Sequence, residues 1–269
     1  MDIFQAIIIA IVEGLTEFLP ISSTAHMIFT STFFGIQEDE FVKMFQVSIQ
    51  FGAILSVVVL YWRKFLNFKS FDFYIKLALA VVPALVLGKL FDDKIDELLG
   101  SPIPIAIAMI LGGVVLLFID NVFKNPIIEK EEDITVKKAI SIGFWQCLAM
   151  MPGVSRSAAS IIGGMQQKLT RDVAAEFSFF LAVPTMAAVT LYSVFLKDWG
   201  TGENVQKGYE MIAQSGNLSI FIIGNIIAFL VALLAIKTFV EVIKKYGFKF
   251  FGYYRIFAGI VILILLLVK

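Results

Sequence analysis

Long apolar runs alternate along the chain with short polar connections. A helix that crosses the hydrocarbon core of a bilayer needs roughly 17 to 25 mostly apolar residues. Six segments reach that length, and we expect each to form a transmembrane helix: residues 44–62, 73–90, 102–119, 177–196, 218–236 and 250–268. The pattern therefore predicts an all-α polytopic membrane protein with six transmembrane helices.

Two further apolar stretches are interrupted by polar residues before they are long enough to span a bilayer. The first, residues 3–12, runs into Glu13 and Glu17, and Pro20 then ends the helix before a second apolar arm begins. The other, residues 139–151, is stopped by a Pro-Gly pair and also followed by a second arm. Such irregular backbone is tolerated at membrane depth only where it lies inside protein or lines a wet cavity. We therefore predict two re-entrant helical hairpins.

Each predicted hairpin is followed by three spans, which divides a single domain, residues 1–269, into halves of about 1–124 and 125–269. Because three is an odd number, the two halves have opposite orientations in the bilayer. Inverted-topology repeats with broken helices are typical of transporters. Aligning the prolines of the two breaks places Ser23 on Ser155. Sequence identity between the halves is low, so the prediction of a repeat depends on the number of spans.

Basic residues are concentrated in the connections on one side of the predicted membrane. Twelve lie on that side: Arg63, Lys64, Lys69, Lys124, Lys130, Lys137, Lys138, Lys168, Arg171, Lys244, Lys245 and Lys249. Five lie on the other: Lys43, Lys94, Lys197, Lys207 and Lys269. Cytoplasmic loops carry the excess of Lys and Arg. We therefore expect both termini and the first hairpin to face outside, the second hairpin to enter from the cytoplasm, and the two tips to meet near the middle of the bilayer.

The composition agrees with an integral membrane protein. Hydrophobic residues make up 59% of the chain and charged residues only 16%, and the mean hydropathy is +0.87. The formal net charge is zero, so no bulk attraction to nucleic acid is expected. Ionisable groups at membrane depth are costly and usually functional. The polar residues of the two breaks are therefore the candidates for chemistry.

The first break holds groups that suit chemistry on an anion. Ser23 and His26 are three residues apart and share a helix face, a spacing that lets an imidazole take the proton of a serine nucleophile. The run Ser22-Ser23-Thr24 also begins a helix, whose free N–H groups attract anions. The alternative is structural: Ser22 is only an N-cap and His26 only a buried histidine with satisfied hydrogen bonds.

Two acidic residues, Glu13 and Glu17, lie four apart on one face of the helix before this break. Two ionised carboxylates in lipid repel each other and need a cation, a metal ion or a proton between them. Together they could hold a divalent ion against a phosphate, or one of them could orient His26. An interfacial pair that faces water is the alternative.

The second break places Arg156 between Ser155 and Ser157, directly after a glycine that permits a tight turn and close approach to a ligand. Arginine binds phosphate oxygens through two N–H groups and stays charged when buried. This arrangement predicts an oxyanion cradle, and a structural ion pair with an acidic residue of the first break is the alternative. Arg255, in the last span, is either a second phosphate clamp or an interface residue, and the sequence favours neither.

These motifs resemble those of the undecaprenyl-diphosphate phosphatase family, also called the bacitracin-resistance protein family. The resemblance covers the whole chain and is carried by three segments: Glu13-x-x-x-Glu17, Ser22-Ser23-Thr24-Ala25-His26, and Pro152-Gly153-Val154-Ser155-Arg156-Ser157-Ala158-Ala159-Ser160. The sequence departs from the family where Ala25 and Ala158 replace a frequent glycine and Ser160 replaces the usual threonine. All three residues are small, and Ser160 keeps the hydroxyl.

The resemblance implies hydrolysis of undecaprenyl diphosphate to undecaprenyl phosphate and inorganic phosphate at the outer face of the bacterial inner membrane. The product is the recycled lipid carrier for peptidoglycan and other envelope polymers, and bacitracin resistance follows. Stimulation by Mg²⁺ or Ca²⁺ is also implied, with Glu13 and Glu17 as candidate ligands and no organic cofactor. The partners are then the lipid substrate and the bilayer, and a homodimer is possible.

The residues and the resemblance together assign roles within the site. Catalysis is assigned to Ser23, His26, Glu17 and Arg156, with Ser23 or His26 as the nucleophile. Substrate binding is assigned to Glu13, Ser22, Thr24, Gly153, Ser155, Ser157, Ser160 and Arg255. In this hypothesis His26 deprotonates Ser23, Glu17 orients His26, and Glu13 helps to hold the divalent ion.

A secondary transporter or a polyprenyl-phosphate flippase is the alternative function, because broken helices in inverted repeats also build transporters. Release of phosphate in detergent separates the two hypotheses, since transport alone leaves no chemical product.

Overall fold

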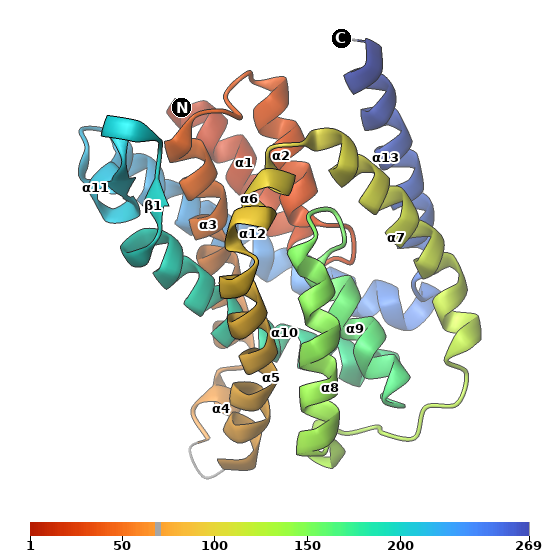
Figure 1. The fold of residues 1–269 in the computed structure, drawn as a ribbon. Helices are drawn as coiled ribbons and strands as arrows, with labels where there is room; N and C mark the ends of the chain where they lie inside the picture. Colours follow the sequence, from red (N-terminus) through yellow and green to blue (C-terminus); the bar gives the residue numbers. More distant parts are fainter. Residues whose placement is uncertain (68–70, 269) are drawn as a thin grey trace.

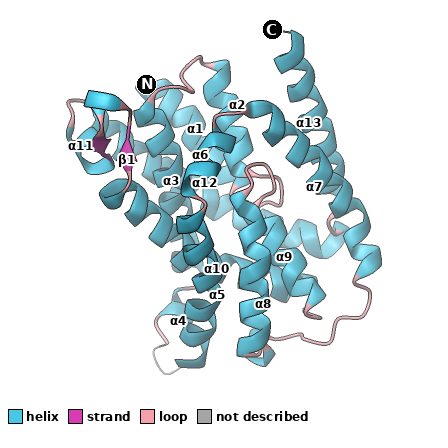
Figure 2. Ribbon diagram, in the orientation of Figure 1, coloured by secondary structure: helices cyan, strands magenta, loops and turns pink. Residues whose placement is uncertain are grey.

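The computed structural model describes residues 1–67 and 71–268, and this part of the chain is largely helical (Figure 1, Figure 2). The α-helices are α1 (Ile3–Thr16), α2 (Ser23–Phe33), α3 (Glu40–Leu60), α4 (Trp62–Phe65), α5 (Phe71–Leu90), α6 (Asp92–Leu99), α7 (Pro102–Val122), α8 (Val136–Gln146), α9 (Arg156–Gln166), α10 (Arg171–Leu191), α11 (Gly208–Ala213), α12 (Asn217–Tyr246) and α13 (Lys249–Val268). A short antiparallel ribbon of β1 (Asp198–Trp199) and β2 (Gln206–Lys207) lies between α10 and α11. Lys69 and Lys269, two of the loop lysines counted above, fall outside the described residues.

Six of the described helices are long and apolar enough to cross a membrane, as the hydropathy pattern predicts. They are α3, α5, α7, α10 with the π-helical turn that extends it to Leu196, α12 and α13. Polar residues set where some of them begin. The carboxylate of Asp39, for example, accepts from N–H of Phe41 at 2.9 Å and caps α3. The chain is therefore a multi-pass membrane protein, and the six predicted spans are confirmed as helices.

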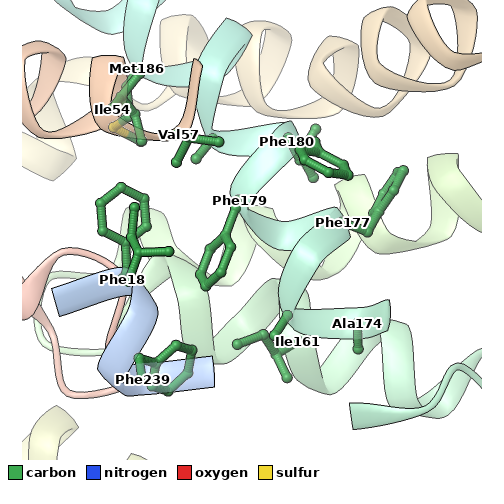
Figure 3. Close-up of a cluster of buried hydrophobic side chains, with 14 of the residues drawn as sticks. Phe18, Ile54, Val57, Ile161, Ala174, Phe177, Phe179, Phe180, Met186 and Phe239 are labelled. Carbon is green, nitrogen blue, oxygen red and sulfur yellow. The ribbon is translucent and has the colours of Figure 1, made fainter. Parts of the chain in front are cut away.

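The main core is built around phenylalanines of α10. Phe179 is fully buried and meets Phe18 edge-on, with ring centroids 5.3 Å apart (Figure 3). Phe239 of α12 also packs against Phe179, at 5.9 Å between centroids. Aromatic pairs in this arrangement stabilise a core beyond their buried area. Because Phe18 directly follows Glu17, its burial in this cluster anchors the first break and fixes where the acidic side chain lies.

The two interrupted apolar stretches form helix–break–helix units, as predicted. Helix α1 ends at Thr16 and α2 begins at Ser23, while α8 and α9 are separated by a short 3₁₀ turn and the segment around Gly153. In Figure 1 the α1–α2 and α8–α9 connections come together near the middle of the molecule. They are in direct contact, because Oγ of Ser157 donates a hydrogen bond to the carbonyl oxygen of Leu19 at 2.8 Å.

Candidate functional site

A buried cluster of Glu17, Ser23 and Arg156, hereafter the Glu17 cluster, joins the two breaks. Oγ of Ser23 donates to Oε2 of Glu17 at 2.6 Å, and Nη2 of Arg156 donates to Oε1 of the same carboxylate at 2.7 Å. Glu17 follows the end of α1, Ser23 begins α2, and Arg156 begins α9. These contacts confirm that the two breaks lie together in the fold.

The ion pair in this cluster is almost completely removed from solvent. The side chains are 9% exposed for Arg156 and 4% for Glu17. Taking two charges out of water is expensive, and such a pair is tolerated when further hydrogen bonds satisfy its remaining donors and acceptors. Arg156 therefore does form the ion pair with an acidic residue of the first break that was considered as the alternative to a phosphate cradle. The same carboxylate also accepts the hydrogen bond from Ser23.

Ser178 of α10 holds the other side of Arg156. Nη1 of Arg156 donates to the carbonyl oxygen of Ser178 at 3.0 Å and to its Oγ at 3.3 Å. Oγ of Ser160 lies 2.6 Å from Oγ of Ser178 and 2.9 Å from the carbonyl oxygen of Arg156. Ser160 is fully buried, and its hydroxyl contacts place it as a support for Arg156. The sequence pattern did not identify Ser178 as a residue of the site. A serine within an otherwise apolar predicted span could have pointed to it.

The two helices that start at the breaks share a rare local conformation. Ser22 and Ser155 have φ of 70° and 79°, and their hydroxyls accept from N–H of Ala25 and Ala158 at 3.4 and 3.3 Å. Positive φ is costly for non-glycine residues and clusters at functional sites. Each helix start leaves its first N–H groups without an intrahelical partner, so two anion-attracting helix ends lie beside the Glu17 cluster.

This shared conformation changes the alignment of the two halves. By local structure Ser22 matches Ser155, which places Ser23 opposite Arg156. The alignment on the prolines, which placed Ser23 on Ser155, is therefore off by one residue. The physical reason is that the second break has one more residue than the first between its proline and the helix cap.

The hydroxyls of the predicted cradle bind protein groups. The proton of Ser157 goes to the carbonyl oxygen of Leu19, so Ser155 is the donor in its 3.1 Å contact with Ser157. Thr24 is half-buried. Gly153 has φ of 93°, which the predicted tight turn requires. Its close approach, however, is to α7, because an added Cβ would lie 2.4 Å from the carbonyl oxygen of Ile105.

His26 is not paired with Ser23 in this arrangement. Its Nδ1 lies 2.7 Å from the carbonyl oxygen of Ser22, and its Nε2 lies 2.8 Å from the hydroxyl of Tyr254. Since the Ser23 hydroxyl donates to Glu17, the expectation that His26 deprotonates Ser23 and that Glu17 orients His26 is wrong for this geometry. Tyr254 is a contact that spacing did not predict, since it is 228 residues away.

The side chain of Arg255 is fully buried and does not reach solvent. Its five N–H donors all reach backbone carbonyls, at distances of 2.7 to 3.3 Å: those of Ala108, Met109, Pro20, Gly153 and Val154. Arginine has only five N–H groups. The assignment of Arg255 to substrate binding is therefore wrong, because no N–H donor remains for a phosphate. Arg255 instead has a structural role, which we call the brace: it links α7 to both breaks through these hydrogen bonds.

Glu13 differs from every other charged group of the site. It is completely buried, and neither carboxylate oxygen has a hydrogen-bond partner among the described residues. Its polar neighbours are the carboxylate of Glu17, the guanidinium of Arg156 and the hydroxyl of Ser23, none of which is within hydrogen-bonding geometry of Glu13. Within the described part of the chain, no group of three or more His, Cys, Asp or Glu side chains is arranged to hold a metal ion. A cation at Glu13 would therefore need ligands from water or a bound anion.

The fold and the site define an integral membrane protein in which a serine, a carboxylate and an arginine form a buried site between two helix starts. This chain belongs to the bacitracin-resistance family, since the family described as "Bacitracin resistance protein BacA" matches residues 6–261.

The chain is also similar to curated proteins over nearly its whole length. A protein from Flavobacterium psychrophilum is 56% identical over 265 residues, which cover 98% of this chain and 96% of that protein. One from Flavobacterium johnsoniae is 52% identical with the same coverage, and one from Porphyromonas gingivalis is 48% identical over 99% of this chain and 98% of the relative. All three relatives are named undecaprenyl-diphosphatase.

Proposed function

We propose that this protein hydrolyses undecaprenyl diphosphate to undecaprenyl phosphate and inorganic phosphate. The observation that carries the proposal is the contact of Ser23 and Arg156 with one carboxylate, that of Glu17, between two helix starts. A nucleophile, a base and a phosphate-binding cation thus lie together, and transport alone does not require that combination. The names of the relatives support the choice of substrate.

In the proposed mechanism Ser23 attacks the terminal phosphorus of the diphosphate. Its proton passes to Oε2 of Glu17, 2.6 Å away, as the Oγ–P bond forms and the bond to the bridging oxygen breaks. Undecaprenyl phosphate leaves. Water then attacks the phosphoserine and the Oγ–P bond breaks. Glu17 returns its proton to Oγ of Ser23, and inorganic phosphate departs with both protons of the water.

Charge stabilisation is the main demand of phosphoryl transfer. Arg156 supplies a full positive charge next to Ser23, and its Nε has no hydrogen-bond partner in the described part of the chain. The N–H groups at the starts of α2 and α9 add partial positive charge from two directions. These donors are fixed before the substrate arrives, so little reorganisation is required during the reaction.

The arrangement in the bilayer forms part of the proposal. The α1–α2 and α8–α9 units are re-entrant hairpins of an inverted repeat, the site opens to the outer face of the bacterial inner membrane, and both termini lie outside. The lipid tail stays among the spans while the diphosphate reaches the breaks. The product is the lipid carrier used again for peptidoglycan and other envelope polymers, which accounts for bacitracin resistance.

Replacing Ser23 by alanine is expected to lower phosphate release in detergent by roughly 10³-fold or more, because the nucleophile is removed. Wild type quenched during turnover should carry phosphate on Ser23, which mass spectrometry locates. Ser101→Ala is the matched control, since Ser101 is exposed and makes no capping hydrogen bond. Phosphate found on His26 would transfer the nucleophile role to that residue. Chemical turnover without any trapped adduct would favour direct attack by water.

The unpartnered oxygens of Glu13 support a divalent cation as part of this proposal. Mg²⁺ is commonly bound by one or two carboxylates together with substrate phosphates and water. Glu13 and Glu17 would hold Mg²⁺ or Ca²⁺ in this way, and the cation would neutralise charge on the phosphate oxygens. The protein residues retain the roles described above.

A Glu13→Gln variant should need at least about tenfold more Mg²⁺ for half-maximal activity, because the site loses one of its two anionic ligands. Titration of phosphate release with Mg²⁺, together with Mn²⁺ binding followed by electron paramagnetic resonance, measures this shift. Glu129→Gln changes an exposed carboxylate and serves as the control. An unchanged Mg²⁺ dependence in Glu13→Gln would remove Glu13 from the set of cation ligands.

A further inference from the structure

Both ring nitrogens of His26 are occupied, and their partners define the protonation of the neutral ring. The Ser22 carbonyl, 2.7 Å from Nδ1, can only accept a hydrogen bond, so Nδ1 carries the proton. In a neutral imidazole the other nitrogen is then an acceptor. The Tyr254 hydroxyl, 2.8 Å from Nε2, is therefore the donor in that contact. The result is a chain of hydrogen bonds from Tyr254 through His26 to the backbone of Ser22.

Tyr254 is well placed to define the position of the imidazole. It precedes Arg255, whose guanidinium is bound by five backbone carbonyls of α7 and the two breaks. The first turns of α13 are therefore anchored to the same backbone that carries the site. The rings of Tyr254 and His26 are also nearly parallel, with an interplanar angle of 8° and centroids 5.7 Å apart.

The end point of this chain is a strained residue. Ser22 has φ of 70°, and the residue after it is Ser23, which donates to Glu17. A non-glycine residue persists in such a conformation only when its surroundings over-determine it. The contact from Nδ1 of His26 to the Ser22 carbonyl is one of the interactions that hold it.

We propose that Tyr254 is a positioning residue that acts through His26 on the backbone of Ser22 and so holds Ser23 toward Glu17. The proposal rests on the proposed function, because it assigns the oriented group to the phosphatase reaction. Neither Tyr254 nor His26 exchanges a proton with Ser23 in this arrangement. Their contribution is to the orientation of the serine, so loss of the Tyr254 hydroxyl affects kcat more than KM.

The variant Tyr254→Phe removes one hydroxyl and keeps the ring. We expect kcat to fall about fivefold, the effect of one neutral hydrogen bond, with KM changed by less than about twofold. Tyr253→Phe is the matched control. It removes a hydroxyl from the adjacent residue, whose side chain is 65% exposed, and should behave as wild type.

His26 is the single histidine of the chain, so it can be observed directly. Protein labelled with ¹⁵N at histidine and carrying a histidine-free affinity tag gives one pair of imidazole resonances by NMR in detergent at mildly alkaline pH. Wild type should show a protonated Nδ1 and an unprotonated Nε2. Tyr254→Phe should shift the Nε2 resonance, and Tyr253→Phe should not.

Three results would overturn the proposal: a wild-type proton on Nε2, a Tyr254→Phe spectrum identical to that of wild type, or an altered spectrum with unchanged kcat. The wild-type spectrum tests the contact even if the variant does not fold. Wild type that releases no phosphate from undecaprenyl diphosphate, while its ¹⁵N spectrum agrees, would overturn the proposed function and leave the Tyr254–His26 contact in place.

Discussion

A Glu17→Gln protein is expected to release phosphate from undecaprenyl diphosphate roughly 10³-fold more slowly than wild type, the scale of effect that a general base supplies. The amide cannot accept the Ser23 proton during attack. It also leaves the buried guanidinium of Arg156, with a side chain only 9% exposed, without its counter-charge. Both losses fall on kcat, which steady-state assays with saturating lipid in detergent would measure.

The control for this variant is Glu38→Gln, which changes a carboxylate whose side chain is 78% exposed. It should retain wild-type kcat. If Glu17→Gln lost less than about tenfold in kcat, well below what a general base contributes, Glu17 would not be the base. The role would then return to His26, as the spacing of Ser23 and His26 first indicated.

A second large effect is expected for Arg255→Lys, this time on stability. An ammonium has three N–H donors in place of the five of a guanidinium, so at least two of the carbonyls that Arg255 binds lose their partner. Each buried, unsatisfied carbonyl costs about 1–3 kcal/mol, which predicts a free energy of unfolding lower by roughly 2–6 kcal/mol. Thermal or denaturant unfolding in detergent would measure it.

The matched control is Arg63→Lys on α4, where the guanidinium lies near the surface over the ring of Trp62. Its stability should stay close to that of wild type, because surface substitutions usually change the free energy of unfolding by less than about 0.5 kcal/mol. An Arg255→Lys protein with wild-type stability and a raised KM would contradict the structural role of Arg255. It would instead support the earlier prediction that Arg255 binds phosphate.

Much of the architecture follows from local physics. Apolar length predicts the six spans, since only about twenty apolar residues cross a bilayer. Glu13, Glu17 and Pro20 interrupt a half-length apolar run, and that is enough to predict a break. The cost of placing ionisable groups among lipid also singles out Glu17 and Arg156, and the structure brings both together with Ser23.

The pairing of these groups does not follow from spacing. Ser23 and His26 share a helix face, but helical side chains lean toward the helix N-terminus. Ser23, in the first turn of α2, therefore reaches back to Glu17, while His26 reaches back to the carbonyl of Ser22. Direction along the helix therefore places Ser23 against Glu17, although its spacing from His26 indicated the imidazole as the base.

The sequence by itself determined which segments are apolar enough to span a membrane, where they are broken, and which polar side chains lie at the breaks, because these properties depend on neighbouring residues. Only the tertiary structure decided which donor meets which acceptor. Arg156 and Glu17 are 139 residues apart, and Arg255 and Pro20 are 235 apart. Contacts at such separations depend on how whole helices pack. A shift of less than one ångström between donor and acceptor is enough to break a hydrogen bond, so these pairs cannot be read from local sequence.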